Sequence, residues 1–162
     1  MMKKNHLRFT LAVTCVAMVL IAIAVCLNGC AVTEPPAPEQ MENTFQTYRS
    51  EIRIITDYLL TQEPPVSIYG DSQGLPENVA QAIKTLMRQA GCSSIHYNES
   101  AVHFVLWTRF TDAGCGIAYS EATSLGFLEG DFPYLTQEQP LSEQNWFYYV
   151  EDYAQWRIEK NK

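Results

Sequence analysis

Two histidines stand at positions where a β-hairpin would bring their side chains together. Residues 93–97 and 101–110 are rich in β-branched and aromatic residues, and Asn98-Glu99 supplies a turn between them. With that turn at the centre, the numbers of opposing residues sum to 199, so His96 faces His103 across the two strands. Two imidazoles at cross-strand distance are a pair that a metal ion could use.

A complete metal site needs further ligands, and the spacing does not supply them. Cys92 shares a strand face with His96, but four residues of extended chain put it about 13 Å away at roughly 3.3 Å per residue. Nothing in the pattern brings Glu99 or Glu121 to the two histidines. We therefore predict no metal and no cofactor, and interpret the histidines as part of a partly exposed sheet face.

Cys92 and Cys115, the two cysteines that follow residue 30, could pair in an oxidising compartment. A second turn centred on Asp112-Ala113 would oppose residues whose numbers sum to 225, which sets Cys115 against Phe110. In that register Cys115 points to the sheet face that Cys92 does not use. A regular sheet therefore predicts no cross-strand disulfide, whereas a one-residue bulge would reverse this geometry.

Cys115 is also a candidate nucleophile, because it stands between Gly114 and Gly116. A nucleophilic thiol needs a base within hydrogen-bond reach. The predicted register sets His103 opposite Ala122, far along the strand from Cys115. The glycines are better explained by the preceding turn, and we predict no catalytic residue.

Paired carboxylates, which could act as acid and base or as calcium ligands, occur twice in the chain. Glu151 and Asp152 are adjacent, so on a strand they would point to opposite faces and would not share a substrate. Glu129 and Asp131 lack the regular spacing of a calcium loop. We interpret both pairs as solvated acids.

Aromatic residues are concentrated near the C-terminus, at Trp146, Phe147, Tyr148, Tyr149, Tyr153 and Trp156. Strand alternation sends Trp146 and Tyr148 to one face, and Tyr149 to the other face with Phe147 and Glu151. Rings exposed on one face and rimmed by acids could stack on sugars or receive a protein partner. The candidate binding residues are Trp146, Tyr148, Tyr149 and Tyr153, and burial on both faces beneath a long loop is the alternative.

Two helices are predicted to support these segments. The first covers about residues 40–61, where apolar residues recur at steps of three and four; they are Met41, Phe45, Tyr48, Ile52, Ile55 and Leu59. The second starts at Pro76, carries an apolar stripe, and ends at Gly91, which suits a left-handed cap.

Strand signals occupy much of the remaining chain. Val66–Tyr69 is predicted to form a short strand, and residues 93–120 are predicted to form three antiparallel strands. The aromatic segment near Trp146 is predicted to form another strand. Residues 121–143 contain glycines and prolines and are predicted to be mostly loop packed over the core. This order predicts an α+β domain over residues 41–162, with two helices packed on a mostly antiparallel sheet in two layers.

The first 29 residues have the pattern of a signal peptide or membrane anchor. Lys3, Lys4 and Arg8 precede an uncharged run, Phe9 to Leu27, that spans about 28 Å as a helix. That length is close to the hydrocarbon thickness of a bilayer. Because basic residues favour the cytoplasmic side, we expect the rest of the chain on the outer face of the cell membrane.

The end of this segment, Leu27-Asn28-Gly29-Cys30, resembles the lipobox of bacterial lipoproteins. The resemblance implies that Cys30 receives a lipid and that the chain is cleaved just before it, while an uncleaved single-pass anchor is the alternative. Residues 30–40 contain Pro35, Pro36 and Pro38 and are predicted to form an extended tether. Both alternatives place the domain outside the cell and make the membrane a partner.

The charge of the exported part limits the classes of partner that it can bind. After residue 30 there are eight basic and eighteen acidic residues, a net charge of −10. Such a field repels nucleic acid, so no nucleic-acid partner is expected. The sequence predicts a binding or interaction module of the cell envelope for a protein or cell-wall ligand, and the alternative is a small envelope hydrolase that uses His103, Cys115 and an acid.

Overall fold

The structure, a computed structural model, describes residues 34–70, 74–109, 112–128, 130–154 and 158. The predicted signal or anchor segment, 1–29, and Cys30 lie outside these residues. The chain divides into Met1–Glu34 and a compact unit, Pro35–Lys162, which holds all the described helices and strands. Within the described ranges, no helix combines the length and the apolar character needed to cross a bilayer.

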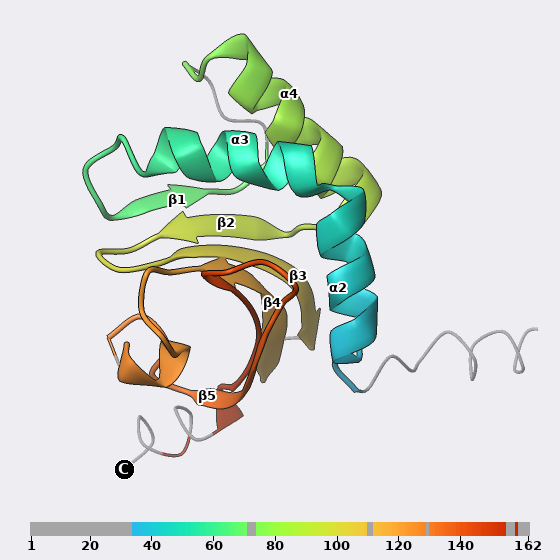
Figure 1. The fold of residues 1–162 in the computed structure, drawn as a ribbon, viewed down its shortest axis with the longest axis vertical. Coiled ribbons are helices and arrows are strands. Elements are labelled where there is room, and N and C mark those ends of the chain that lie inside the picture. The colour runs from blue at the N-terminus through green and yellow to red at the C-terminus, as the bar shows by residue number, and fades with distance from the viewer. Residues whose placement is uncertain (1–33, 71–73, 110–111, 129, 155–157, 159–162) are drawn as a thin grey trace, which may run out of the picture. The chain divides into compact units, whose positions relative to one another are not determined.

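The first predicted helix forms as two. Helix α2 spans Pro38–Thr47 and helix α3 spans Arg49–Leu59, and Tyr48 between them leaves helical geometry with φ −111° and ψ 22°. Figure 1 shows that the two helices run in different directions. The apolar stripe is buried on both sides of the break (Met41, Phe45, Ile52, Ile55, Leu59). The break lets each half turn its apolar face to the core, and α2 begins within the stretch predicted as tether.

The second predicted helix is confirmed. Helix α4 spans Glu77–Thr85, continues as a π-helical turn over Leu86–Ala90, and has Pro76 as its N-cap. Gly91 ends it with φ 73°, a left-handed conformation that glycine adopts without steric cost.

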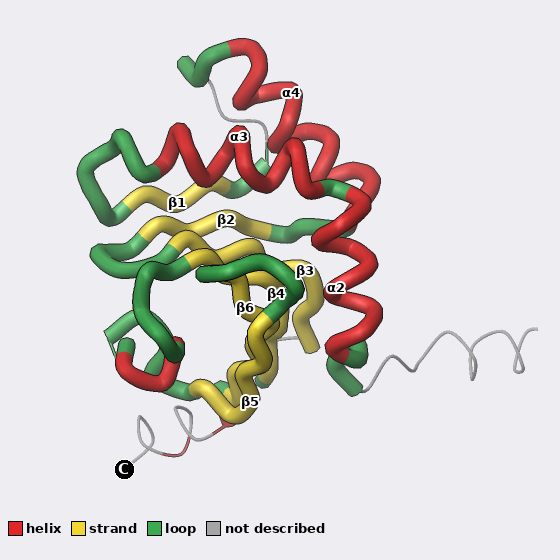
Figure 2. Tube along the Cα trace, viewed as in Figure 1, coloured by secondary structure: helices red, strands yellow, loops and turns green. Residues whose placement is uncertain are grey.

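The described strands form one antiparallel sheet in the order β1-β2-β3-β4-β6-β5 (Figures 1 and 2). The strands are β1 (Val66–Ile68), β2 (Ser94–Tyr97), β3 (Val102–Arg109), β4 (Ala113–Tyr119), β5 (Leu135–Pro140) and β6 (Trp146–Asp152). The class is therefore α+β, as predicted. The prediction that residues 121–143 are mostly loop is wrong at β5, which forms a strand within that segment. It is an edge strand with a mostly polar sequence, LTQEQP, so it lacks the apolar alternation of a half-buried strand.

The register of the first hairpin is confirmed and that of the second is wrong. His96 pairs with His103 as predicted. Between β3 and β4, Cys115 pairs with Trp107 instead of Phe110, because the strands pair Arg109 with Ala113, three residues away from the predicted register. A bulge between Val105 and Trp107 shifts the register by one further residue.

Cys92 and Cys115 both join the core beneath the helices, and both thiols are free. The prediction that they lie on opposite faces is therefore wrong: Cys92 precedes β2, where the strand alternation does not apply. Strand β3 still lies between them, and strands two places apart are separated by about 10 Å. That exceeds the roughly 7 Å between Cα atoms that a disulfide tolerates.

The two faces of the sheet carry separate apolar clusters. Trp146 and Tyr148 belong to the cluster that contains the buried residues of the helices, whereas Phe147 and Tyr149 pack with Leu125 and other loop residues. Figure 2 shows the helices on one side and the loop before β5 on the other. The predicted alternation of β6 is confirmed, and the long loop covers the face that the helices leave open.

Candidate functional site

A polar cavity lies on the sheet face that the long loop covers. Its volume is about 310 Å³, and its chemistry comes from His96, His103 and Glu151 on the sheet and from Asp131, Tyr134 and Tyr153 in loops. Strands β2, β3 and β6 thus supply one wall and the loops supply the other. Within the part of the chain that the structure describes, no lysine or arginine lines it.

His103 is a buried histidine of this cavity, and one of its ring nitrogens has no hydrogen-bond partner among the described residues. Its side chain is 5% exposed, and its ring stacks on Phe132 at 4.1 Å between centroids with an interplanar angle of 5°. Tyr149 meets the same ring edge to face at 5.9 Å. Burial, together with nearby His96, lowers the pKa of His103 to about 3, so the ring is neutral at physiological pH.

The Nε2 atom of His103 is buried and has no hydrogen-bond partner among the described residues. Such an orphan costs about 1–3 kcal/mol relative to a satisfied group. Native proteins keep few of them, and each one calls for an explanation. A ligand donor that reached this atom would supply the missing partner.

His96 faces His103 but is already engaged. Its Nδ1 lies 3.0 Å from Ser67 Oγ and its Nε2 lies 2.9 Å from Ser94 Oγ. Tyr69 packs against the ring edge at 5.3 Å, and burial lowers the pKa of His96. The predicted pairing is therefore real, but within the described ranges no three histidine, cysteine or acidic side chains come close enough to hold a metal ion.

Glu151 places a buried carboxyl at the other end of the wall. Its side chain is 5% exposed and accepts a hydrogen bond of 2.8 Å from the Tyr153 hydroxyl. Burial raises the pKa of Glu151, although this hydrogen bond and one from the Tyr134 backbone N–H act in the opposite direction. Gly114 lies opposite Glu151, and a Cβ there would be in ordinary van der Waals contact with the Tyr153 ring, at 3.4 Å.

Asp131 brings a second carboxyl from the loop. One of its oxygens, Oδ2, is buried and has no partner among the described residues. Burial raises the pKa of Asp131 and so does the nearby Glu99, whereas a hydrogen bond from the Ser100 backbone N–H lowers it. The two atoms with unmet hydrogen bonding in the cavity, His103 Nε2 and Asp131 Oδ2, can both act as acceptors.

The four predicted binding aromatics do not form one surface. Trp146 and Tyr148, 4% and 1% exposed, lie in the core beneath the helices, where Trp146 packs on Phe45 at 5.0 Å and the Tyr148 hydroxyl donates to the Pro36 carbonyl at 3.0 Å. Tyr149 and Tyr153 line the cavity instead. Aromatic rings are therefore buried on both faces of β6, which is the alternative that the sequence left open.

Cys115 and His103 do not meet. Cys115 belongs to the core beneath the helices, while His103 packs on the opposite face with Phe132 and Tyr149. Burial raises the pKa of the Cys115 thiol to about 12, so it is not a thiolate near neutral pH. A hydrolase built on these two residues has no support in this geometry.

The prediction that Glu151 and Asp131 are solvated acids is wrong, because Glu151 is buried and Asp131 is half-buried. Glu151 does point away from Asp152, which caps the Ala154 backbone N–H at 2.8 Å, but it is buried. The sequence signal was available: Glu151 continues the buried face of Phe147 and Tyr149. Asp131 had no such signal, because a loop gives no periodicity, and its predicted companion Glu129 lies outside the described residues.

Comparison with protein-family models, with curated proteins and with solved structures gave no match.

Proposed function

We propose that this chain is a membrane-tethered binding protein of the cell envelope whose α+β domain, outside the cytoplasm, holds a small polar group of its ligand in the His103 cavity. The observation that carries this proposal is the neutral, buried His103 ring with an unpartnered Nε2 in a cavity of about 310 Å³. A bound ligand would repay the cost of that orphaned atom.

The tether is supported by the sequence of the N-terminal segment. The basic start, the apolar run Phe9 to Leu27 and the lipobox-like Leu27-Asn28-Gly29-Cys30 favour lipid attachment at Cys30, with an uncleaved anchor as the alternative. The partner membrane would then lie next to the N-terminus of the domain. The proline-rich residues before α2 would act as a short spacer.

Binding is better supported than catalysis. A general base works best when its pKa is near the working pH, and the pKa of His103 is about 3. The thiol of Cys115 lies in the other core. The rival function, a small envelope hydrolase, would have to operate with His103 and Glu151 alone.

The volume of the cavity and the net charge of the exported part limit the class of ligand. A cavity of this volume admits a side chain or part of a sugar unit from a protein or cell-wall partner, not a folded element. The net charge of −10 after residue 30 disfavours nucleic acid and other polyanions. We therefore propose recognition of one chemical group on a larger envelope component.

Two experiments test the tethered, outward-facing arrangement. Mass spectrometry of the mature N-terminus should find a lipid-modified Cys30, and the Cys30→Ser variant should lose the modification. In intact cells, added protease should digest the domain. An unmodified N-terminus together with a domain that is protected until lysis would contradict the tethered, outward-facing arrangement.

Ligand binding is tested with the full chain in mild detergent and soluble cell-wall fragments. A fragment that binds the cavity should raise the unfolding temperature, since a ligand at a hundred times its Kd stabilises a protein by about 2.7 kcal/mol. The effect should vanish in His103→Phe and persist in the control Thr56→Val, which alters a buried residue of α3. Equal stabilisation of all three chains would exclude the cavity as the binding site.

A further inference from the structure

We infer that the group bound in the His103 cavity is a protonated amine. This inference rests on the proposed binding function and names the chemical class of the ligand. It follows from the charge, the hydrogen-bonding capacity and the aromatic walls of the cavity, each of which favours a small organic cation.

The charge of the lining is one-sided. Asp131 and Glu151 both contribute carboxyls, and no lysine or arginine is among the described residues that line the cavity. Burial raises the pKa of each carboxyl, and the hydrogen bonds that each accepts offset this destabilisation of the negative form only in part. A cation in the cavity would further stabilise the negative forms, whereas an anion would add repulsion.

The unmet hydrogen bonds match an ammonium group. Asp131 Oδ2 is an acceptor, and the neutral His103 ring offers the lone pair of Nε2 when Nδ1 carries the proton. An ammonium group has three donors and no acceptor. Its N–H groups would satisfy these buried acceptors, and its positive charge would lie in the same cavity as the Glu151 carboxyl.

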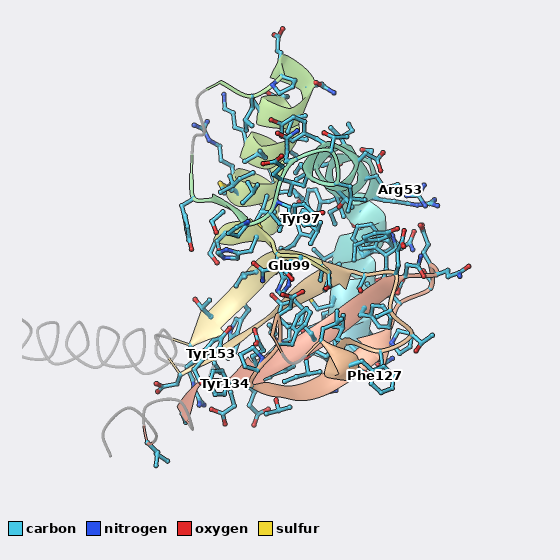
Figure 3. All side chains as sticks on the ribbon, turned by 90° about the vertical axis from the view of Figure 1, so that its left-hand side faces the viewer. Arg53, Tyr97, Glu99, Phe127, Tyr134 and Tyr153 are labelled. Atoms are coloured by element: carbon cyan, nitrogen blue, oxygen red, sulfur yellow. The ribbon has the colours of Figure 1, made fainter. Side chains whose placement is uncertain are left out.

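Aromatic rings complete the match. Tyr134 and Tyr153 lie side by side in Figure 3 and pack edge to face, with centroids 6.0 Å apart and planes at 78°. Together with Tyr149 they line the cavity. The faces of such rings attract cations, with about 2 kcal/mol or more available where the cation is desolvated.

Other ligand classes fit less well. A divalent metal requires a larger set of ligands, and no group of three such side chains occurs among the described residues. A neutral hydroxyl could donate a hydrogen bond, but it would bring no positive charge to the two carboxylates. The amine alone meets the charge and the hydrogen-bonding requirements together.

The test uses three probes that share an apolar tail and differ in one end group: butylamine, butanol and butyrate. Each is titrated by calorimetry, at millimolar concentration and pH 7, into the full chain in mild detergent. We expect butylamine to bind at least about tenfold more tightly than butanol, a difference of about 1.4 kcal/mol. Butyrate should give no binding heat.

Variants separate the site from the acidic surface. Glu151→Gln and Asp131→Asn, which remove charge with little change of shape, should each weaken butylamine binding about tenfold. The matched control is Glu63→Gln, because Glu63 is exposed and lies outside the cavity, and it should bind like the unaltered chain. Since Asp131 is in a loop, its variant keeps the test valid if Glu151→Gln does not fold.

The outcomes distinguish a failure of the amine assignment from a failure of the proposed binding site. If butanol or butyrate binds as tightly as butylamine and His103→Phe abolishes that binding, the cavity is a binding site but the amine assignment is overturned. If butylamine binds all variants equally, it adsorbs to the acidic surface and the assignment is also overturned. If none of the three probes binds, both the amine assignment and the proposed site fail.

Discussion

Replacement of His103 by phenylalanine should stabilise the domain, and the gain should grow as the pH falls. Phenylalanine keeps a ring to stack on Phe132 and removes the buried, unpartnered Nε2. That removal is worth about 1–3 kcal/mol at pH 8, where both the folded and the unfolded histidine are neutral.

The pH dependence follows from the titration of His103. Its pKa is about 3 in the folded state, against an ordinary value of 6.5, so the unfolded chain binds more protons between these two values. Stability therefore rises with pH across this window and falls as the pH is lowered. At pH 5, about 1.5 pH units below the ordinary value, the unaltered chain has lost about 2 kcal/mol through this group. The phenylalanine variant does not lose it.

The assay is urea unfolding of the full chain in mild detergent, followed by tryptophan fluorescence at pH 8 and pH 5. For a urea slope of about 1–3 kcal/mol per molar, an extra 2 kcal/mol moves the difference between the midpoints by about 1 M. The control is Thr56→Val, which removes another buried and unpartnered polar atom that does not titrate. Its gain in stability should be the same at both pH values.

Two results would refute this reasoning. A stability difference between His103→Phe and the unaltered chain that is equal at pH 8 and pH 5 would mean that His103 is not held neutral by burial. A pH-dependent gain in Thr56→Val would mean that the change comes from the general electrostatics of the chain. His96 is present in all three chains, so its own titration cancels in the comparison.

Two further predictions concern the sheet. Gly116→Ala should cost about 3 kcal/mol or more of unfolding free energy, because a Cβ there would lie 1.8 Å from the Phe104 carbonyl oxygen; Gly130→Ala, with nothing within 4 Å, is the control, and equal stability of the two variants in urea would show that the strands are not so close. Cys92 and Cys115, whose pKa values burial raises to about 12, should react with iodoacetamide at pH 8 only after unfolding, as read by peptide mass spectrometry. Rapid labelling of either thiol in the folded chain would contradict its burial.

The helices and the first hairpin could be predicted because their signals are local. The three-four spacing of apolar residues marks the helical stripes, and Gly91 marks the end of α4. The turn at Asn98-Glu99 fixes the register that pairs His96 with His103. In each case neighbours in sequence decide the geometry.

The second register and strand β5 could not be predicted in the same way. The numbers of paired residues in β3 and β4 sum to 222 from Trp107 to Arg109 and to 221 from Val102 to Val105, instead of the predicted 225. Nothing in the composition of that segment specifies the register or the bulge. Strand β5 pairs only with β6 at the edge of the sheet, so its polar residues remain compatible with solvent. Its strand character depends on the partner and not on its own pattern.

The amino-acid sequence by itself determined the α+β class, the two apolar helical stripes, the facing histidines and the expectation of an exported, tethered chain. Only the tertiary structure decided that His103, Glu151 and Asp131 share a cavity and that Cys115 does not. The reason is that a site is made by side chains from distant segments on one face of the sheet, and that face depends on register, on bulges and on how the loop folds over it. Local pattern specifies an element, whereas burial and a missing hydrogen-bond partner exist only once the elements are packed.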